Sequence, residues 1–421
     1  MKSPHTIAIL GYGVEGKSAR LFLRKKFPKA IIEIRDKKNG PDYLKDLGEF
    51  DMIVRSPGVP YMLPEIQRAE KRGVMISSAT KLFLHEFQRE QNGRPTSIWT
   101  LDVHMVGITG TKGKGTTASM LLSILKTAKR KVFLVGNIGV PMLSIIPKIS
   151  RGTVIIVELS SFQLQDLEES PHIAAILEIA PDHQDYHHSM AEYVRAKSNI
   201  ARHQKKSDVC IYIKRNKYAS SIARLSTGNK IAVDVVTEGE YWEDVLTVPG
   251  KHNTYNAAVA ANVARALKID EKYIEYGLKK FKGLPHHMEV VATKNGIRYI
   301  NDSASTNPVS TKAALESIDT SVVLIAGGVD KNFDYTMLAP TIASRDIRGI
   351  VLFGQNRKTI FNALPRGKVI FADSLEDALK KAKGLAHAGD TILFSPASAS
   401  FDMFKNSKDR GAQFSRLIKQ G

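Results

Sequence analysis

Short apolar runs alternate with helical segments along nearly the whole of this 421-residue chain. Such alternation is typical of α/β folds, in which mainly parallel strands are buried between helices. A chain of this length exceeds what one hydrophobic core usually organises, so two or three domains are expected. We predict three α/β domains, spanning residues 1–95, 96–283 and 284–421.

Polar and turn-rich stretches mark the predicted boundaries. Q-N-G-R-P-T-S (91–97) is typical of a linker, and F-K-G-L-P-H (281–286) precedes a hairpin candidate over 288–300. In that hairpin, Asn295-Gly296 is a strong two-residue turn signal. The other strands and the helices that we expect are strands 6–10, 30–35, 52–56, 74–78, 132–136, 153–159, 174–179, 209–213, 230–236, 322–328, 349–354, 368–372 and 391–395, and helices 118–128, 190–204, 253–267 and 272–281.

Charge and composition exclude several classes of protein. The formal net charge is +19, but the excess is spread over all three parts, whereas a nucleic-acid footprint is normally a patch or stripe, so we expect no nucleic-acid partner. The single cysteine, Cys210, lies in an apolar run and predicts a core residue rather than a disulfide. No apolar run approaches the length of a membrane span, and no signal peptide precedes the first strand, which favours a cytoplasmic protein.

An apolar strand runs directly into a glycine-rich, lysine-bearing turn at 105–117 (M-V-G-I-T-G-T-K-G-K-G-T-T). Glycines at 110, 113 and 115 let the backbone wrap an anion closely, and Lys114 supplies a point charge for a β- or γ-phosphate. The following helix aims its N-terminal N–H groups at the same place. The stretch therefore predicts a cradle for a nucleoside triphosphate.

This loop departs from the strict G-x-x-x-x-G-K-S/T pattern. Ile108 stands where the first glycine belongs, and Gly115 follows the lysine. A hydroxyl for Mg²⁺ would then come from Thr116 or Thr117, one residue later than usual.

A second glycine loop, at 11–18 (G-Y-G-V-E-G-K-S), matches the strict pattern. Gly11, Gly13 and Gly16 also satisfy G-x-G-x-x-G, and Asp36 closes the next strand, where an acid could meet a ribose hydroxyl. Spacing alone leaves NAD binding, UDP-type binding and a true triphosphate loop open. A tight βα turn that binds nothing is a further alternative.

A series of motifs in fixed order resembles the Mur ligase and folylpolyglutamate synthase superfamily over essentially the whole chain. The string E-L-S-S-F-Q-L and the short first domain are similar to the D-glutamate-adding type, the UDP-N-acetylmuramoyl-L-alanine:D-glutamate ligases. The motifs are S-P-G-V (56–59), the loop at 109–116, G-N-I-G (136–139), V-E-L-S-S-F-Q-L (157–164), D-H-Q-D-Y-H (182–187), G-K-H-N-T-Y-N (250–256), G-L-P-H (283–286), N-D-S-A-S-T-N (301–307) and S-P-A-S-A-S-F-D-M-F-K-N (395–406).

The resemblance implies a Rossmann-like N-terminal domain, a central P-loop-type mononucleotide-binding domain and a Rossmann-like C-terminal domain. It implies an ATP-dependent ligase that joins D-glutamate to UDP-N-acetylmuramoyl-L-alanine through an acyl phosphate and releases ADP and phosphate. The reaction would serve cytoplasmic peptidoglycan precursor synthesis, and the protein would act as a monomer. A superfamily ligase with another acceptor, of the folylpolyglutamate synthase or another Mur type, is the alternative, weakly favoured by Gly115-Thr116. A nucleotide sensor without turnover is the alternative from another class.

The resemblance implies four catalytic residues, Lys114, Glu158, His183 and Lys197. Their chemistry suits the transfer of a phosphoryl group. Lys114 would screen the approaching anions, and Glu158 is a hard carboxylate of the kind that Mg²⁺ prefers. Thr116, Glu158, His183 and Lys197 would hold two Mg²⁺ ions, with Lys197 modified by CO₂ to a carbamate, which turns a cation into an anionic ligand. Without the resemblance, Lys197 would be taken for a surface lysine. The spacing of His183, His187 and His188 could suggest zinc, but the surrounding carboxylates and triphosphate loop favour magnesium.

The resemblance also implies three sets of binding residues, in which the early loop holds the diphosphate of UDP and not ATP. The ATP-binding set is Gly110, Thr111, Lys112, Gly113, Lys114, Gly115, Thr116, Thr117, Asn253, Asn256, His287 and Asp302; the UDP-substrate set is Gly13, Val14, Glu15, Asp36, Ser56, Gly58, Asn137 and Ser160; the amino-acid set is Thr306, Lys331 and Ser400.

At three positions the chain departs from the family pattern. His287 replaces an arginine that often follows G-L-P-H, so one ATP contact loses a fixed charge. Ala304 replaces a common lysine, and Ser407 replaces an aromatic residue after F-K-N. Ala304 and Ser407 lie near the expected acceptor pocket, which leaves the choice of amino acid open.

Overall fold

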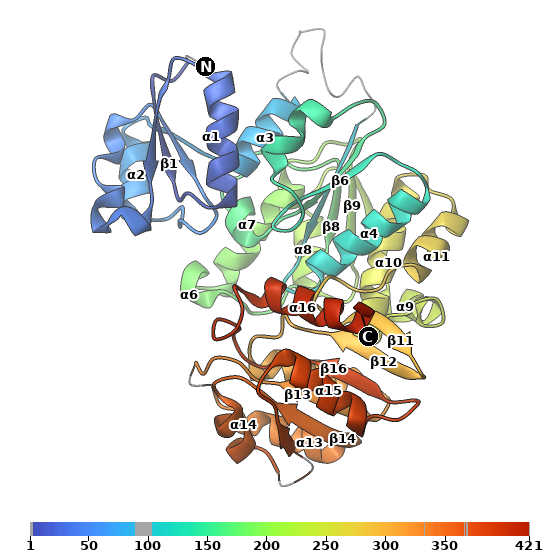
Figure 1. Cartoon of the computed structure of the whole chain (residues 1–421). Helices are drawn as coiled ribbons and strands as arrows, with labels where there is room; N and C mark the ends of the chain where they lie inside the picture. The colour runs from blue at the N-terminus through green and yellow to red at the C-terminus, as the bar shows by residue number, and fades with distance from the viewer. Residues whose placement is uncertain (1–2, 89–102, 332, 366, 368, 421) are drawn as a thin grey trace. The chain divides into compact units, whose positions relative to one another are not determined.

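A computed structural model describes residues 3–88, 103–331, 333–365, 367 and 369–420. It contains three sheets, one within each predicted domain, and so confirms the three-domain α/β fold (Figure 1). The chain divides into two compact units, one of residues 1–244 and 254–278 and one of residues 245–253 and 279–421. The first unit holds two of the sheets. The expected linker at 91–97 lies outside the described residues, and the boundaries at 95 and 283 stay predictions.

The first sheet has four parallel strands in the order β2-β1-β3-β4. Because β1 lies between β2 and β3, the segments that follow β1 and β3 meet at the carboxyl edge, where open α/β sheets bind ligands. The Ser56 hydroxyl donates to the Gly11 carbonyl at 2.8 Å and ties these two segments together. The elements are β1 (Thr6–Leu10), α1 (Val14–Lys26), β2 (Ile31–Arg35), β3 (Met52–Arg55), α2 (Pro64–Lys71), β4 (Met75–Ser78) and α3 (Ala79–Gln88).

The second sheet has six parallel strands in the order β10-β9-β8-β5-β7-β6. β5, β7 and β8 are adjacent at its centre, so the segments that follow them share the carboxyl edge. The elements are β5 (His104–Thr109), α4 (Lys114–Thr127), β6 (Val132–Gly136), η6 (Met142–Lys148), β7 (Val154–Glu158), α5 (Ser161–Leu164), β8 (Ile173–Ile176), α6 (Gln184–His187), α7 (Met190–Arg202), β9 (Val209–Ile213), α8 (Lys217–Ala223), β10 (Asn229–Val233), α9 (Val235–Glu243), α10 (Lys251–Ala266) and α11 (Glu271–Lys279).

Three predicted boundaries in this domain are wrong. The strand expected over 174–179 ends at Ile176. Helix α4 begins at Lys114 rather than at 118, because the Gly113 carbonyl already accepts the first helical hydrogen bond, from Thr117 N at 2.9 Å. The strand expected over 230–236 ends at Val233, and α9 begins at Val235. The apolar pair Val235-Val236 continued the strand pattern although it lies in a helix.

The third sheet has the order β11-β12-β16-β13-β14-β15, antiparallel only between β11 and β12. The predicted hairpin turn is confirmed: Asn295 and Gly296 both have positive φ, 53° and 75°, as a type I′ turn requires. The elements are β11 (Glu289–Lys294), β12 (Ile297–Asn301), α12 (Pro308–Glu316), β13 (Val322–Ala326), η7 (Thr336–Leu338), α13 (Ala339–Ser344), β14 (Ile347–Leu352), α14 (Arg357–Ala363), β15 (Val369–Phe371), α15 (Leu375–Leu385), β16 (Thr391–Phe394) and α16 (Ser407–Gln420).

One hydrophobic cluster runs through the first two domains. It extends from Ile7 and Ile9 of β1 through Phe83 and Phe87 of α3 to the central sheet, and it includes Cys210, which is buried as predicted. This shared core explains why the two sheets belong to one compact unit. Within the described residues, no helix is long and apolar enough to cross a membrane.

We predict that Gly277→Ala destabilises the first unit. A Cβ at Gly277 of α11 would lie 2.5 Å from the Ile124 Cα of α4, where the Ser123 hydroxyl donates to the Gly277 carbonyl at 2.6 Å. Forcing two helices apart typically costs about 1–3 kcal/mol, and urea unfolding would measure the loss. In the matched control Gly384→Ala, on α15, a Cβ meets nothing within 4 Å. The unfolding free energy of the control should rise by about 0.5 kcal/mol. An equal loss of unfolding free energy in both variants would contradict the packing argument.

Candidate active site

The glycine-rich loop closes around its own lysine. Lys114 Nζ donates to the carbonyls of Gly110 and Thr111, both at 2.9 Å. Burial lowers the pKa of Lys114, and the nearby carboxylates of Glu158 and Asp182 oppose that shift. The loop therefore presents backbone and an amine to one small space, the arrangement expected of a phosphate cradle.

Gly113 and Asn256 fix the shape of this loop. Gly113 has φ +80°, and a Cβ there would lie 2.3 Å from Asn256 Oδ1, so only glycine fits. Thr117 is buried and its hydroxyl donates to the same Asn256 oxygen at 3.2 Å. Thr116 is partly exposed beside it. The structure thus commits Thr117 to packing and leaves the Thr116 hydroxyl as the one with access to solvent.

Glu158 lies at the carboxyl end of β7 with only 3% of its surface exposed. Asn137 Nδ2 donates to its Oε1 at 3.1 Å, while Oε2 is buried and has no hydrogen-bond partner among the described residues. Burial raises the pKa of this carboxyl, and Asn137, Lys114 and Lys197 oppose the shift. A buried carboxylate oxygen without a donor is costly unless a cation binds it, which fits an Mg²⁺ ligand.

Lys197 is 1% exposed, so it is not the surface lysine that its helix position alone would suggest. Its Nζ donates to the Gly110 carbonyl at 3.0 Å and to Thr109 Oγ1 at 3.3 Å, and lies 4.7 Å from the centre of the Tyr193 ring. Burial, and then the charge of Lys114, lower the pKa of Lys197 to about 7. An amine with this pKa is largely available in the neutral form that reacts with CO₂.

The three histidines of the 182–188 region do not converge. His183 is exposed, has φ +50°, and packs edge-on against Phe162 with ring centres 4.9 Å apart. His187 is buried, with Nε2 2.9 Å from Ser161 Oγ, and His188 is exposed. No group of three or more histidine, cysteine, aspartate or glutamate side chains able to hold a metal occurs among the described residues. A second ion at His183 would therefore need a ligand of another kind, such as a carbamate.

The early glycine loop is held from the neighbouring strand. Asp36 Oδ2 accepts from Tyr12 N at 2.6 Å and Oδ1 from Lys38 N at 2.9 Å, and these hydrogen bonds lower its pKa. A Cβ at Gly16 would lie 2.2 Å from the Gly11 carbonyl oxygen, so the helix can approach the turn only with glycine there. Lys17 is exposed and, unlike Lys114, does not lie inside its loop.

The remaining members of the UDP-substrate set line the start of α1 and the segments beside it. Gly13 is the N-terminal cap residue of α1, Val14 is 70% exposed, and Gly58 is exposed. Glu15 Oε1 accepts from Gln163 Nε2 at 3.2 Å, and burial raises the pKa of Glu15. Ser160 caps α5 through its reciprocal hydrogen bonds with Gln163.

The two asparagines expected at the adenine base have structural partners. Asn256 supports the phosphate loop, and Asn253 Nδ2 donates back to the Pro249 carbonyl at 2.6 Å. In the second unit, Asp302 accepts from Met288 N at 3.1 Å and from Ser395 Oγ at 2.7 Å, and burial raises its pKa to about 6. Burial lowers the pKa of His287. The ATP contacts assigned to these four residues stay predictions.

The amino-acid set lies on segments that follow adjacent strands. β12, β16 and β13 are neighbours, so the segments carrying Thr306, Ser400 and Lys331 leave the same edge of the sheet. Val329 N donates to the Ala399 carbonyl at 2.9 Å and joins two of them. Lys331 is exposed, with its Nζ 5.8 Å from the centre of the Phe401 ring.

The two departures near this set are structural neighbours of one another. Ala304 N donates to the His286 carbonyl at 2.9 Å, and Ser407 begins α16. Ser303 Oγ donates to the Ser407 carbonyl at 2.8 Å. The backbones at Ala304 and Ser407 therefore help to hold the segment that carries Thr306 in place.

Comparison with known proteins decides the family. Residues 108–244 match the family model for the Mur ligase middle domain, and residues 286–398 match the Mur ligase glutamate ligase domain. A protein named UDP-N-acetylmuramoylalanine–D-glutamate ligase from Acetivibrio thermocellus is 35% identical over 90% of this chain and 84% of its own length. A protein of the same name from Lachnoclostridium phytofermentans is 32% identical over 98% of this chain and 97% of its own length. The chain belongs to the Mur ligase family.

Solved structures agree on the fold of this Mur ligase. The UDP-N-acetylmuramate-alanine ligase of Thermotoga maritima superimposes with a TM-score of 0.55 at 17% identity and covers 99% of each chain. Folylpolyglutamate synthase from the same organism gives a TM-score of 0.59 at 15% identity, covering 81% of this chain and 94% of its own. At these identities the likeness concerns the fold alone.

Four buried polar residues of this Mur ligase escaped the sequence analysis: Arg55, Gln163, Asp166 and Arg410. The S-x-x-Q spacing from Ser160 to Gln163 is a recognisable capping box, and the structure confirms it. Arg55 lies inside the expected strand 52–56, and its charge near the end of an apolar run is the only signal that could have pointed to it. Its partner is more than one hundred residues away in the sequence, and no local pattern indicates such a pair.

We predict that burial of Lys197 makes stability depend on pH. The pKa of Lys197 is about 7 in the folded protein against 10.5 for a free side chain, so between these values the unfolded chain binds more protons. The unfolding free energy of the protein relative to Lys197→Met should rise by about 1–2 kcal/mol from pH 7.5 to pH 9. Urea titrations in CO₂-free buffer with a chelator would measure it.

Lys206→Met, which removes an exposed lysine just beyond α7, controls for the loss of one positive charge. A difference between the protein and Lys197→Met that stays flat or falls with pH would contradict the assignment.

Proposed function

We propose that this Mur ligase is the ATP-dependent enzyme that joins D-glutamate to UDP-N-acetylmuramoyl-L-alanine in peptidoglycan precursor synthesis. The observation that carries the proposal is the convergence of Lys114, Glu158 and Lys197 on the Gly110 loop. Relatives that bear this activity in their names match most of the chain. We take the enzyme to act as a monomer on small molecules in the cytoplasm.

The first chemical step brings two anions together. The alanyl carboxylate attacks the γ-phosphorus of ATP, the bond to the bridging oxygen breaks, and an acyl phosphate and ADP result. Lys114 would offset the negative charge that gathers on the phosphoryl oxygens, and the position of its amine against the carbonyls of the loop supports this role. The amine of D-glutamate then attacks the acyl carbon, and phosphate leaves as the amide forms.

Magnesium is the group that this chemistry requires, and the residues present fit it. Thr116, Glu158, His183 and a carbamate on Lys197 would hold two Mg²⁺ ions, which neutralise phosphate charge when bound. The buried, unpartnered Glu158 oxygen supports this assignment. The carbamate would form when the neutral amine of Lys197 attacks CO₂ and releases one proton to solvent.

The early loop suits a diphosphate better than a transferable triphosphate. Gly13 caps the 13-residue helix α1 and Val14 begins it, and because the first N–H groups of a helix have no partner within the helix, a diphosphate can bind there. Lys17, the lysine of the strict pattern, is exposed, whereas Lys114 lies inside its loop. We therefore assign ATP to the central loop and the UDP moiety to the first domain.

D-glutamate would bind to the third domain. The exposed ammonium of Lys331 can pair with the side-chain carboxylate of the amino acid, and the hydroxyls of Thr306 and Ser400 can donate to it. Ala304 and Ser407 border this region, and they would affect how the acceptor is selected.

We expect phosphate release to require UDP-N-acetylmuramoyl-L-alanine and D-glutamate together. A panel that includes L-glutamate, other amino acids and folates, read by a phosphate assay, should give turnover only with D-glutamate. Removal of CO₂ should lower the rate, and bicarbonate should restore it, because Lys197 would lose and regain its carbamate. Turnover with a folate, or with no amino acid, would refute the assignment.

We expect Lys114→Ala to lower kcat by a factor of about 10²–10³, because the phosphoryl charge loses its buried cation. Steady-state kinetics at saturating ATP would measure the loss. Lys126→Ala removes an exposed lysine from the last turn of the same helix and should retain nearly full activity. Undiminished turnover in Lys114→Ala would mean that the loop is misassigned.

A further inference from the structure

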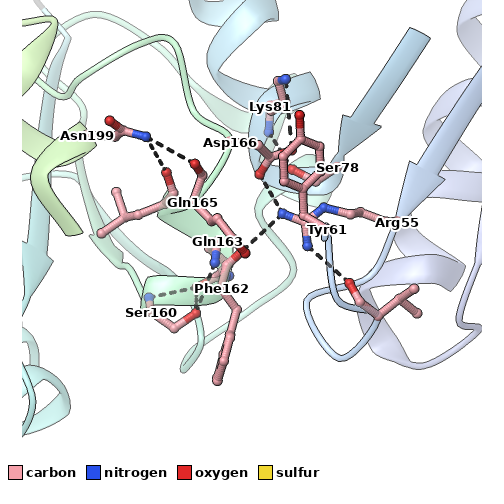
Figure 2. Close-up of polar contacts among 12 residues, drawn as sticks. Arg55, Tyr61, Ser78, Lys81, Ser160, Phe162, Gln163, Gln165, Asp166 and Asn199 are labelled. Atoms are coloured by element: carbon pink, nitrogen blue, oxygen red, sulfur yellow. Dashed lines mark hydrogen bonds and ion pairs between the residues drawn. The ribbon is translucent and has the colours of Figure 1, made fainter. Parts of the chain in front are cut away.

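Arg55 joins the first domain to the catalytic segment of the central domain. It ends β3 and is 1% exposed. Its guanidinium donates to Val59 O at 3.3 Å within its own domain. It also donates to Phe162 O at 3.0 Å and to Asp166 Oδ1 at 2.5 Å, both in the segment that follows Glu158 (Figure 2).

The arrangement around Arg55 is fixed by burial. The side chain of Asp166 is 3% exposed, so both members of the ion pair have lost their hydration. Two buried charges stay together only where geometry and further hydrogen bonds compensate the desolvation. The Tyr61 ring lies 5.5 Å from the guanidinium, and Lys81 Nζ lies 3.9 Å from Asp166 Oδ2 (Figure 2). The planar Arg55 guanidinium donates hydrogen bonds to three acceptors here, two carbonyls and one carboxylate, and the single ammonium group of a lysine cannot reproduce this geometry.

Phe162, whose carbonyl Arg55 holds, lies at the centre of an aromatic cluster. Its ring packs against His183 at 4.9 Å, Tyr186 at 4.4 Å and His187 at 5.6 Å between centres. The Tyr186 hydroxyl accepts from Tyr61 N at 3.3 Å, which ties this cluster to the first domain a second time.

The cluster extends to both candidate ligands of the second ion. The Tyr193 ring is 5.4 Å from His187 and 6.3 Å from His183. Lys197 Nζ lies over the Tyr193 ring, 4.7 Å from its centre. His183 therefore contacts both Tyr193 and Phe162, whose carbonyl Arg55 binds, and Lys197 contacts the same Tyr193 ring.

We propose that Arg55 is a positioning residue that acts through Phe162 on His183 and Lys197 and so couples the UDP-binding domain to the metal-binding segment. Ser56, the next residue, ties the same strand end to the Gly11 loop. The end of β3 therefore contacts both the Gly11 loop, where we propose that the UDP moiety binds, and the segment that follows Glu158. Binding at the loop would in this way affect the geometry of the catalytic segment. The roles of His183 and Lys197 rest on the proposed function, whereas the coupling itself is a property of the fold.

Amide hydrogen exchange tests the coupling without substrate, nucleotide or metal. In Arg55→Lys, which keeps the charge but loses the fork, exchange in 159–166 and 183–190 should accelerate at least fivefold. Exchange in α8, on another part of the same sheet, should stay unchanged. The matched control is Arg68→Lys, which changes an exposed arginine paired with Glu65 at 3.2 Å. Unchanged exchange in 159–166 would overturn the proposal.

Kinetics supply the second readout, at a temperature where each variant is folded. Arg55→Lys should lower kcat about tenfold and raise the half-saturating Mg²⁺ concentration, with KM for ATP within twofold of the original. Asp166→Asn should lower kcat less than Arg55→Lys does, because Arg55 can still donate to the Phe162 carbonyl. The double variant Arg55→Met, Asp166→Asn should lose no more of its kcat than Arg55→Met alone, because both substitutions act through one contact.

The outcomes separate this proposal from the proposed function. If the unaltered enzyme releases no phosphate with the two substrates, the function fails while the exchange experiment still decides the coupling. If it is active and the losses of the Arg55 and Asp166 variants simply add, or match those of Arg68→Lys, the coupling is wrong and the function stands. Should Arg55→Met not fold, Arg55→Lys and Asp166→Asn carry the test.

Discussion

The carbonyl oxygen of Gly110 accepts a hydrogen bond from two lysines, Lys114 at 2.9 Å and Lys197 at 3.0 Å, and the active site depends on this convergence. Two ammonium groups against one carbonyl repel each other; Lys197 is buried and Lys114 is partly buried, so the charged form of each is disfavoured. Glu158 and Asp182 are the nearby anions that offset this cost, while the burial of Glu158 disfavours its own charged form. A carbamate on Lys197 would replace the repulsion by attraction and give a cation two anionic neighbours, which is the charge balance that a triphosphate with magnesium needs.

This constraint also supports the proposed assignment of ATP to the central loop rather than to the early loop, which matches the phosphate-loop pattern better. The pattern records which residues allow a tight turn, but not whether the lysine is enclosed. At 11–18 the turn is stabilised by Asp36 from the next strand, and Lys17 stays in solvent. At 109–117 the turn is stabilised by Asn256 and the lysine is enclosed. Gly115 after the lysine is compatible with the helix because the first helical hydrogen bond starts at Gly113.

The sequence predicted the fold, which depends on local signals, and local signals also placed the glycine-rich loop of the candidate site at the end of a buried strand. Buried strands, the Asn295-Gly296 turn and the glycine loops each follow from a few adjacent residues. Errors arose at the ends of elements: at the start of α4, where the Gly113 carbonyl already accepts a helical hydrogen bond, and at Val235, which continues an apolar strand pattern but begins a helix. The burial of Lys197 was beyond prediction from its helix, because α7 is polar on several sides and only the β5 loop beside it makes that position internal. The Arg55–Asp166 pair joins segments that no local pattern connects.

Arg55 and Arg410 show that the same device recurs in each compact unit. In the second unit, Arg410 is fully buried and donates to the Ser303 hydroxyl at 3.0 Å, the Ser303 carbonyl at 2.8 Å and the Ser398 carbonyl at 3.0 Å. Burial lowers the pKa of Arg410 to about 10, so it remains charged at neutral pH. Segments that leave parallel strands carry carbonyls that no neighbouring strand satisfies, and a guanidinium with five donors can serve several at once. Because open α/β sheets generally bind ligands at these strand ends, the residues that complete the backbone hydrogen bonding there would, under the proposed function, also determine how well the reacting groups are aligned.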